Sequence, residues 1–246
     1  MARTLLVCGT ATSGKTTSLK SLENQEKVLY LNCESAKGLD LPFRNKFMKR
    51  LITDPEVELK GPGSFLDQAR KHSDKIDIVV IDSLTMCMRT YENKYVKTAP
   101  NTQQAWGAYA DFVDNLLNQE IATLPQTVIV TAHVGETEDK KTFTTETKAL
   151  IKGSVGKVGV EAYFNNIVSC KRLPVEWLKA NYKNDLLTYT EKEEALGFKH
   201  VIQTQLTKDT CSEKLRSNED MWTEQETFIN GDIQLVLNRL KEYYGE

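Results

Sequence analysis

The chain has 246 residues, of which 40% are hydrophobic, and this is enough for one α/β domain with a sizeable core. Its 32 basic and 34 acidic residues give a net charge of −2, which excludes a general electrostatic attraction to nucleic acid, so any such binding needs a local basic patch. No apolar stretch approaches the length of a membrane span and the first residues read as a strand, so we expect a cytoplasmic protein without membrane contact.

The first half of the chain alternates apolar, β-rich runs with segments of helical periodicity. The expected elements are a strand at 4–8, a helix at 15–22, a strand at 27–32, a helix at 64–72, a strand at 76–82, a helix at 84–91, a segment at 94–101 broken by Pro100, a long helix at 102–124 and a strand at 127–133. Such alternation predicts an α/β fold with a mainly parallel central sheet flanked by helices.

The second half gives weaker signals. We expect a polar, charged loop at 134–147, a short helix at 155–162, strands at 164–170 and 200–206, a charged and helix-prone insertion at 173–198, a polar loop at 207–220 and a closing helix at 232–244. Nothing in the composition requires a second domain, so residues 1–246 are expected to form one.

Residues 9–16 form a complete phosphate-binding motif, G-x-x-x-x-G-K-T, directly after the apolar run 5–7. Its glycines allow backbone N–H groups to converge on a triphosphate, Lys15 supplies a cation for the β- and γ-phosphates, and the Thr16 hydroxyl suits Mg²⁺. The alternative is a chance glycine turn, but the motif lies between an expected strand and an expected helix, as such a site requires. The predicted nucleotide-binding residues are Gly9, Thr10, Ala11, Thr12, Ser13, Gly14, Lys15, Thr16 and Thr17.

Two carboxylates follow apolar strands and are expected at the same edge of the sheet. Asp82 ends the run 76–81, where a central parallel strand delivers a carboxylate to a bound metal, although it could instead cap the next helix. We predict that Asp82 and Thr16 hold Mg²⁺. Glu34 follows the strand 27–32 and is a candidate general base for the attacking water, while an exposed loop glutamate is equally compatible with this spacing.

His133 ends the strand 127–133 and is expected at the same edge as Asp82, where its imidazole would sense the γ-phosphate. A lone histidine is more often structural, and the chain has only two others, His72 and His200, so no metal cluster is predicted.

In their order along the chain, these residues resemble the RecA-like core ATPases, in particular short phage proteins of that superfamily that anneal or recombine single-stranded DNA. The resemblance rests on the phosphate motif, the strands ending in Glu34 and Asp82, Trp106–Gly107, the strand ending in His133, and the segment 152–154 leading to Tyr163–Phe164. It implies ATP and Mg²⁺ as cofactors, Glu34 as the catalytic glutamate beside Lys15, and His133 as the residue that couples the γ-phosphate to a DNA-binding loop.

The same resemblance implies single-stranded DNA as a partner and assembly into a homo-oligomer, either a ring or a filament. The loop 134–147 would then face DNA, with Lys140, Lys141 and Lys148 at phosphates and Phe143 stacked on a base, although its acidic residues also suit a solvated flexible loop. Cations acting across the subunit boundary are expected among Lys157, Lys214 and Arg216, each of which is also an ordinary surface charge when taken singly. A single-strand-binding protein or an exonuclease would be a reasonable further partner.

The sequence therefore predicts a DNA-stimulated ATPase that promotes single-strand annealing or strand pairing. The alternative is a regulator or recombination mediator in which nucleotide switches a protein-binding surface, with Trp177 and Tyr182 of the insertion as anchors, unless their helical spacing reflects core packing. A small-molecule kinase is disfavoured because the arginines do not cluster into a lid.

Overall fold

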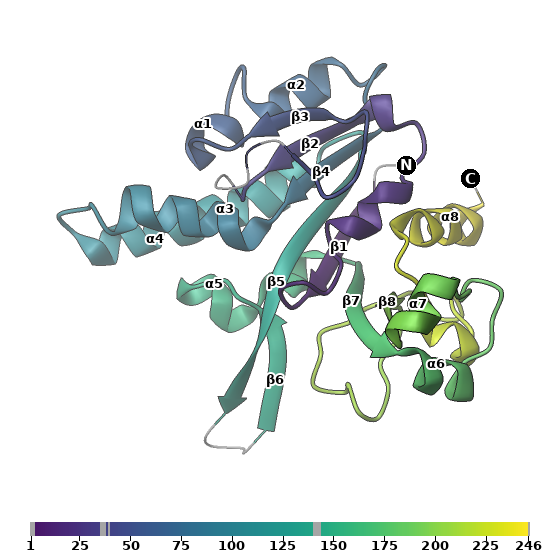
Figure 1. Ribbon diagram of the computed structural model, residues 1–246. Coiled ribbons are helices and arrows are strands. Elements are labelled where there is room, and N and C mark those ends of the chain that lie inside the picture. The colour runs from purple at the N-terminus through teal and green to yellow at the C-terminus, as the bar shows by residue number, and fades with distance from the viewer. Residues whose placement is uncertain (1–2, 35–37, 39, 140–143, 246) are drawn as a thin grey trace.

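The computed structural model describes residues 3–34, 38, 40–139 and 144–245 (Figure 1). Within these residues, nine strands form a sheet in the order β3-β2-β4-β5-β1-β7-β8-β9, and β6 pairs with β5 beside this path. Their bounds are β1 Thr4–Gly9, β2 Val28–Asn32, β3 Met48–Leu51, β4 Ile78–Asp82, β5 Thr127–Asp139, β6 Thr144–Ala149, β7 Asn166–Pro174, β8 Phe198–Gln203 and β9 Phe228–Asn230. The pairings from β3 to β7 are parallel, whereas β8 and β9 are antiparallel additions. The predicted α/β fold with a mainly parallel sheet is confirmed.

The central strands are apolar on both faces because helices cover both sides of the sheet. Alternate residues of β1 enter two different clusters: Leu6 and Cys8 face one core, and Leu5 and Val7 face the other. The first core is covered by α2 Phe65–Lys71, α3 Leu84–Tyr91, α4 Thr102–Asn115 and α5 Gly153–Val158. The second is covered by the short 3₁₀ helix η1 Thr17–Ser21 and by α8 Ile233–Tyr244. None of the described helices combines the length and the apolar composition that crossing a membrane requires.

Several sequence predictions of local structure are wrong in type or extent. The helix predicted at 15–22 is the 3₁₀ helix η1, and the long helix predicted at 102–124 is α4 followed by the π-helical turn η5 Leu116–Ile121. The turn η4 Glu92–Val96 is also π-helical. The edge strands β3 and β9, α1 Pro55–Glu58 and the 3₁₀ turns η2 Gln25–Lys27 and η7 Glu224–Thr227 were not predicted, and the helix predicted at 155–162 is divided between α5 and the 3₁₀ turn η6 Val160–Tyr163. The elements that were not predicted have only three or four residues, too few to establish a hydrophobic period.

The polar loop predicted at 134–147 is largely a β-hairpin. β5 continues past the sheet to Asp139 and pairs in antiparallel fashion with β6, so that the two strands project from the body of the molecule (Figure 1). Both of these strand segments are mostly polar, and they are held by the backbone ladder rather than by burial of one face.

The segment 173–198, predicted as a charged insertion, contains α6 Val175–Asn181 and α7 Glu191–Leu196. The rings of Trp177 and Tyr182 contact each other and Phe228 of β9, with centroid separations of 4.8–5.6 Å. Tyr182 is half-buried, while Trp177 keeps 39% of its surface exposed. Tyr182 therefore packs against the small apolar cluster that contains Phe228, whereas Trp177 lies at its exposed margin.

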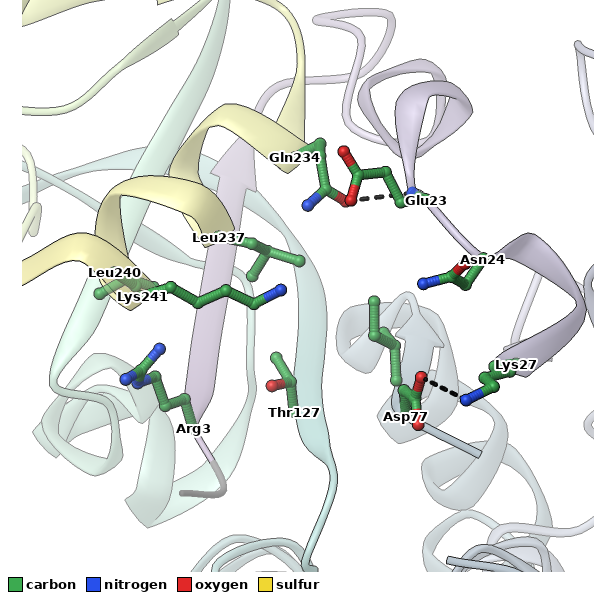
Figure 2. Close-up of a pocket in the computed structure, with 11 residues that line it drawn as sticks. Arg3, Glu23, Asn24, Lys27, Asp77, Thr127, Gln234, Leu237, Leu240 and Lys241 are labelled. Atoms are coloured by element: carbon green, nitrogen blue, oxygen red, sulfur yellow. Dashed lines mark hydrogen bonds and ion pairs between the residues drawn. The ribbon is translucent and has the colours of Figure 1, made fainter. Parts of the chain in front are cut away.

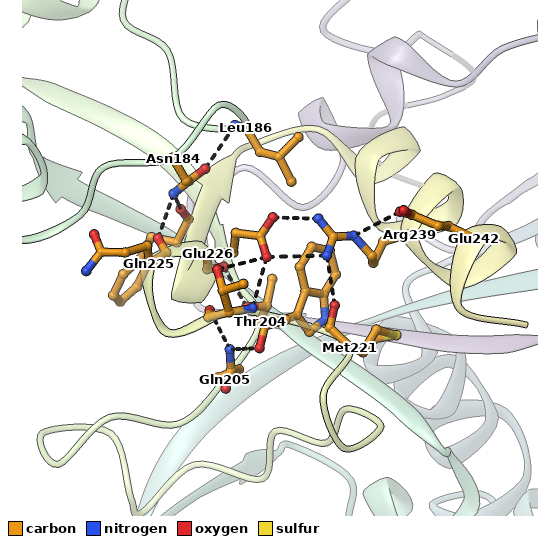
Figure 3. A network of polar contacts seen from close by, with 12 residues as sticks. Asn184, Leu186, Thr204, Gln205, Met221, Gln225, Glu226, Arg239 and Glu242 are labelled. Atoms are coloured by element: carbon orange, nitrogen blue, oxygen red, sulfur yellow. Dashed lines mark hydrogen bonds and ion pairs between the residues drawn. The ribbon is translucent and has the colours of Figure 1, made fainter.

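A polar network ties α8 to the segment before β9 (Figure 3). The Arg239 guanidinium donates to the carboxylate of Glu226 and, at 2.9 Å, to the carbonyl oxygen of Met221. It also lies over the Trp222 ring, 4.8 Å from its centroid. Hydrogen bonds from the backbone N–H and hydroxyl of Thr223 to Glu226, together with the Arg239 contacts, hold the pKa of that carboxyl below its ordinary value against the effect of burial.

Candidate nucleotide site

The register of the sheet brings the predicted site residues to one edge. Gly9 at the end of β1 pairs with His133 on β5, and Asn32 at the end of β2 pairs with Asp82 on β4. Because these four strands are parallel, their carboxyl ends lie together, and this is the edge at which α/β proteins bind ligands. The phosphate loop continues directly from Gly9.

The phosphate loop has a backbone that constrains its residue types. A side chain at Gly9 would place Cβ 2.8 Å from the carbonyl oxygen of Cys170, so the loop can pass β7 only without one. Gly14 has φ +101° and Thr12 has φ +63°, both in the left-handed region. Thr12 is a β-branched residue in that region and therefore needs support from its surroundings.

Lys15 is 6% exposed and its ammonium lies inside the phosphate loop. Nζ donates to the carbonyl oxygens of Gly9 at 2.9 Å and Thr10 at 2.8 Å. Burial lowers the pKa of this ammonium, while the Asp82 and Glu34 carboxylates act in the opposite direction. A phosphate oxygen entering the loop would replace these contacts to neutral carbonyl oxygens with a contact between two opposite charges, which is stronger.

Asp82 is 3% exposed and accepts three hydroxyl hydrogen bonds. Thr16 Oγ1 and the Tyr30 hydroxyl donate to Oδ2, each at 2.7 Å, and Thr131 Oγ1 donates to Oδ1 at 2.5 Å. Burial raises the pKa of Tyr30 far above its ordinary value, and Asp82 adds to this effect, so the phenol remains a donor.

Oxygen donors of this kind fit Mg²⁺, because the Thr16 hydroxyl and the Asp82 carboxylate lie side by side beside the phosphate loop. The described residues contain no group of three or more acidic, histidine or cysteine side chains suited to a metal.

His133 joins the other two predicted catalytic residues. Its Nδ1 lies 3.4 Å from Lys15 Nζ, and its Nε2 lies 3.2 Å from Glu34 Oε1. An ammonium can only donate, so Nδ1 accepts, and the ring proton on Nε2 then faces the Glu34 carboxylate. The backbone N–H of His133 donates to Thr85 Oγ1 at 3.0 Å, which fixes the strand end against α3. Lys15, His133 and Glu34 thus form one continuous polar chain.

A pocket of about 390 Å³ opens beside Glu34. Glu34, Asp82 and Thr16 line it together with Tyr30, Asn32 and the segment 40–42. Both carboxylates and the Thr16 hydroxyl therefore border one cavity.

The predicted cations lie elsewhere in the same chain. Lys148, Lys157, Lys214 and Arg216 line one pocket of about 370 Å³ beside the base of the hairpin, and no residue of the phosphate loop lines it. Three acids share that pocket, namely Glu146, Glu161 and Glu213. Lys214 pairs with Glu146 at 3.0 Å, and Arg216 donates to the carbonyl oxygen of Phe164 at 3.0 Å. Lys140, Lys141 and Phe143 lie outside the described residues.

A separate pocket of about 190 Å³ lies at the opposite edge of the sheet (Figure 2). Arg3, Ile78 and Thr127 line it at the amino ends of β1, β4 and β5, and α8 closes it with Gln234 and Lys241. Because the phosphate loop follows the carboxyl end of β1, this pocket is not part of the nucleotide site.

Three further residues of the candidate site were not predicted from the sequence, namely Tyr30, Thr131 and His200. Tyr30 and Thr131 lie within strands and reach Asp82 only through strand pairing. Alternation along a strand determines the face of the sheet on which each of these side chains lies. That face indicates a contact with Asp82 only once the order of the strands is known. His200 Nε2 lies 3.1 Å from the carbonyl oxygen of Thr12 in the phosphate loop, 188 residues away in sequence.

A family model described as an AAA domain matches residues 1–204. No curated protein matches the sequence. Among solved structures, the crystal structure of the RadB recombinase is similar at 17% identity over 70% of this chain and 76% of that chain, with a TM-score of 0.39.

Proposed function

Because the chain belongs to the AAA domain family, we propose that it is a Mg²⁺-dependent ATPase whose ATP-bound form binds single-stranded DNA and promotes annealing or strand pairing. The observation that carries the ATPase role is the polar chain from Lys15 through His133 to Glu34, placed beside Asp82 and Thr16. A site that bound nucleotide without hydrolysing it would not require the Glu34 carboxylate beside His133.

In this proposal, each residue has a separate task. Lys15 leaves its carbonyl partners for the β- and γ-phosphates, and Thr16 and Asp82 hold Mg²⁺, which neutralises phosphate charge when bound. Glu34 orients a water molecule and accepts its proton as the oxygen attacks the γ-phosphorus, and ADP leaves with the bonding electron pair. His133 contacts both Lys15 and Glu34, so it responds to whether the γ-phosphate is present.

The position of the hairpin supports coupling to DNA. His133 is the residue at which β5 leaves the sheet edge, and its carbonyl oxygen accepts a hydrogen bond from the Leu150 N–H at 2.8 Å, just beyond β6. A shift of His133 is thereby passed to both ends of the projecting hairpin. Lys148 on β6 and the adjacent pocket with Lys157, Lys214 and Arg216 supply cations for a phosphate backbone.

Assembly into a homo-oligomer belongs to the same proposal. Lys157, Lys214 and Arg216 would then act on the phosphates bound by a neighbouring subunit, since they do not line the phosphate loop of their own chain. The rate per subunit should in that case fall on dilution.

A nucleotide-switched regulator is the second candidate. It is favoured by Trp177, which remains 39% exposed on α6 and could anchor a protein partner. In that case, nucleotide would bind with little hydrolysis, and DNA would have no effect on turnover.

The deciding experiment is steady-state ATP hydrolysis with and without single-stranded DNA at a fixed protein concentration. We expect DNA to stimulate the wild-type rate and Lys15→Ala to abolish nucleotide binding. Glu34→Gln should lower kcat by a factor on the order of 10²–10⁴ while ATP still binds. The matched control is Glu219→Gln, an exposed acid outside the site, which should leave the rate unchanged.

Turnover that is indifferent to DNA would overturn the annealing role and favour the regulator. Full activity in Glu34→Gln would remove Glu34 from the mechanism.

A further inference from the structure

His200 on β8 contacts the phosphate loop from outside the catalytic group. Its Nε2 lies 3.1 Å from the carbonyl oxygen of Thr12. Its ring also lies against Gly14, where a Cβ atom would come within 3.1 Å of His200 Cδ2. One imidazole therefore touches the loop at two points, at its apex and next to Lys15.

The chemistry of this contact is fixed by its acceptor. A carbonyl oxygen only accepts hydrogen bonds, so Nε2 carries the proton and donates to Thr12. Thr12 is the residue with φ +63°, a conformation that a β-branched side chain rarely adopts. The hydrogen bond thus stabilises the peptide unit that most needs external support.

The sheet holds His200 in place. It pairs with Arg172 across β7 and β8, and the Phe198 ring meets the imidazole edge-on at a centroid separation of 5.8 Å. At Gly231, just after β9, the backbone passes so close that a Cβ atom would lie 2.8 Å from the His200 carbonyl oxygen. His200 is therefore a fixed point against which the phosphate loop rests.

We propose that His200 is a positioning residue that holds the phosphate loop in its nucleotide-binding shape. It acts through the loop backbone and not on the nucleoside or the attacking water. This proposal rests on the proposed nucleotide-binding function, and it adds a residue of β8 to a site otherwise built from the loop, β2, β4 and β5. The role predicts weaker binding of any ligand recognised by its phosphates, with little change in the chemical step.

The test compares the affinities of MgATP and of magnesium tripolyphosphate, which has the phosphates but no nucleoside. Two variants separate the ring from its donor: His200→Phe keeps a ring against Gly14 without the N–H, and His200→Gln keeps an N–H donor. We expect His200→Phe to raise Kd about tenfold for both ligands, equivalent to about 1.4 kcal/mol, and His200→Gln to stay within about threefold of wild type. At saturating ATP, kcat should change by less than about twofold, because the lost interaction is shared by ground state and transition state.

His72→Phe is the matched control, since His72 is exposed at the end of α2; it should change neither affinity. Thermal unfolding of each variant checks the fold, and His200→Asn, too short to reach Thr12, replaces His200→Phe if that ring is not tolerated.

Unchanged affinity in a folded variant that lacks the N–H donor would overturn the proposal. So would weaker binding of ATP alone, which would indicate a contact with the nucleoside, or a Gln variant as weak as the Phe variant. Wild-type protein that binds neither ligand would instead overturn the proposed function, and this proposal with it.

Discussion

The tautomer of His133 determines how the imidazole connects Lys15 with Glu34. The ammonium must donate, so the imidazole accepts at Nδ1 and presents its Nε2 proton to the carboxylate. When the lysine turns toward a phosphate, the Nδ1 partner is lost while the contact with Glu34 can remain. The arrangement gives a direct physical route by which occupancy of the loop changes the environment of His133.

The hydroxyl of Tyr30 should contribute measurably to stability through Asp82. Tyr30→Phe keeps the ring that stacks near Phe47 but removes one of the three donors to a buried carboxylate. We expect a loss of about 1.5 kcal/mol in the free energy of unfolding, at the lower end for a hydrogen bond to a charged group because two donors remain. Urea unfolding measures it, with the exposed Tyr243→Phe as the control. Equal stabilities would show that Asp82 does not depend on this donor.

Sequence alone pointed to those residues of the candidate site that carry a local signal. The phosphate motif is contiguous, and Glu34, Asp82 and His133 each end an apolar strand, so their shared edge follows from parallel topology. Tyr30, Thr131 and His200 have no such signal, because their roles arise from pairings between distant strands. The placement of Lys214 and Arg216 depends on an irregular loop whose path no periodicity predicts.

At the scale of elements, the β5–β6 hairpin is the largest difference between expectation and structure. Its residues alternate charge and threonine rather than polar and apolar side chains, so no buried face was visible in the sequence. Threonine favours extended backbone, and the cross-strand ladder from Val134–Ala149 to Asp139–Thr144 supplies the hydrogen bonds. The central strands β1, β2 and β4 and the first half of β5 were predicted well because they are apolar on both faces.

The closing helix α8 should depend on the single guanidinium of Arg239. Arg239→Ala removes the hydrogen bonds to Glu226 and Met221 and the contact with Trp222, and it leaves a largely buried carboxylate without its cation. We expect the free energy of unfolding to fall by about 2 kcal/mol, reduced from the value for a fully buried pair because Arg239 is partly exposed. Arg239→Lys should recover less than half, since lysine cannot reproduce the paired geometry.

Urea unfolding of Arg239→Ala beside Arg44→Ala, an exposed arginine, provides the comparison. A loss no larger than that of Arg44→Ala, which should stay within about 0.5 kcal/mol, would show that α8 is held by its apolar face alone.

At the scale of the whole molecule, the two cores bury cysteine thiols and tyrosine phenols. The folded state is stable only while these groups remain protonated and neutral. Burial raises the pKa of the Cys8, Cys33 and Cys170 thiols, the last to about 12, and it raises the pKa of the Tyr30 and Tyr109 phenols. A folded-state pKa above the unfolded value gives stability that is present below the unfolded pKa and lost as pH rises. The unfolded values are near 9.0 for cysteine and 10.0 for tyrosine. The lowered pKa of Lys15 has the opposite effect, because it makes the folded state more stable as pH rises. This is a single group, and it opposes the five groups named above, whose pKa is raised.

The free energy of unfolding should therefore fall as pH rises above about 9, by up to about 1.4 kcal/mol per pH unit for each such group. Urea titrations across this range measure the slope. Cys170→Ala should make the slope shallower, while the exposed Cys211→Ala should not. Stability that stays level or increases would contradict the prediction.

The phosphate loop is held by residues that come from far along the chain: Asp82, His133 and His200 lie 66, 118 and 188 residues from their partners in the loop. Contacts between such distant residues close large loops and therefore form slowly during folding. With His200 in its proposed positioning role, the candidate nucleotide site is complete only after β8 has joined the sheet, and nucleotide would bind only to chains that are folded to that point. By mass action, such a ligand would stabilise the sheet as far as β8 and not the phosphate loop alone.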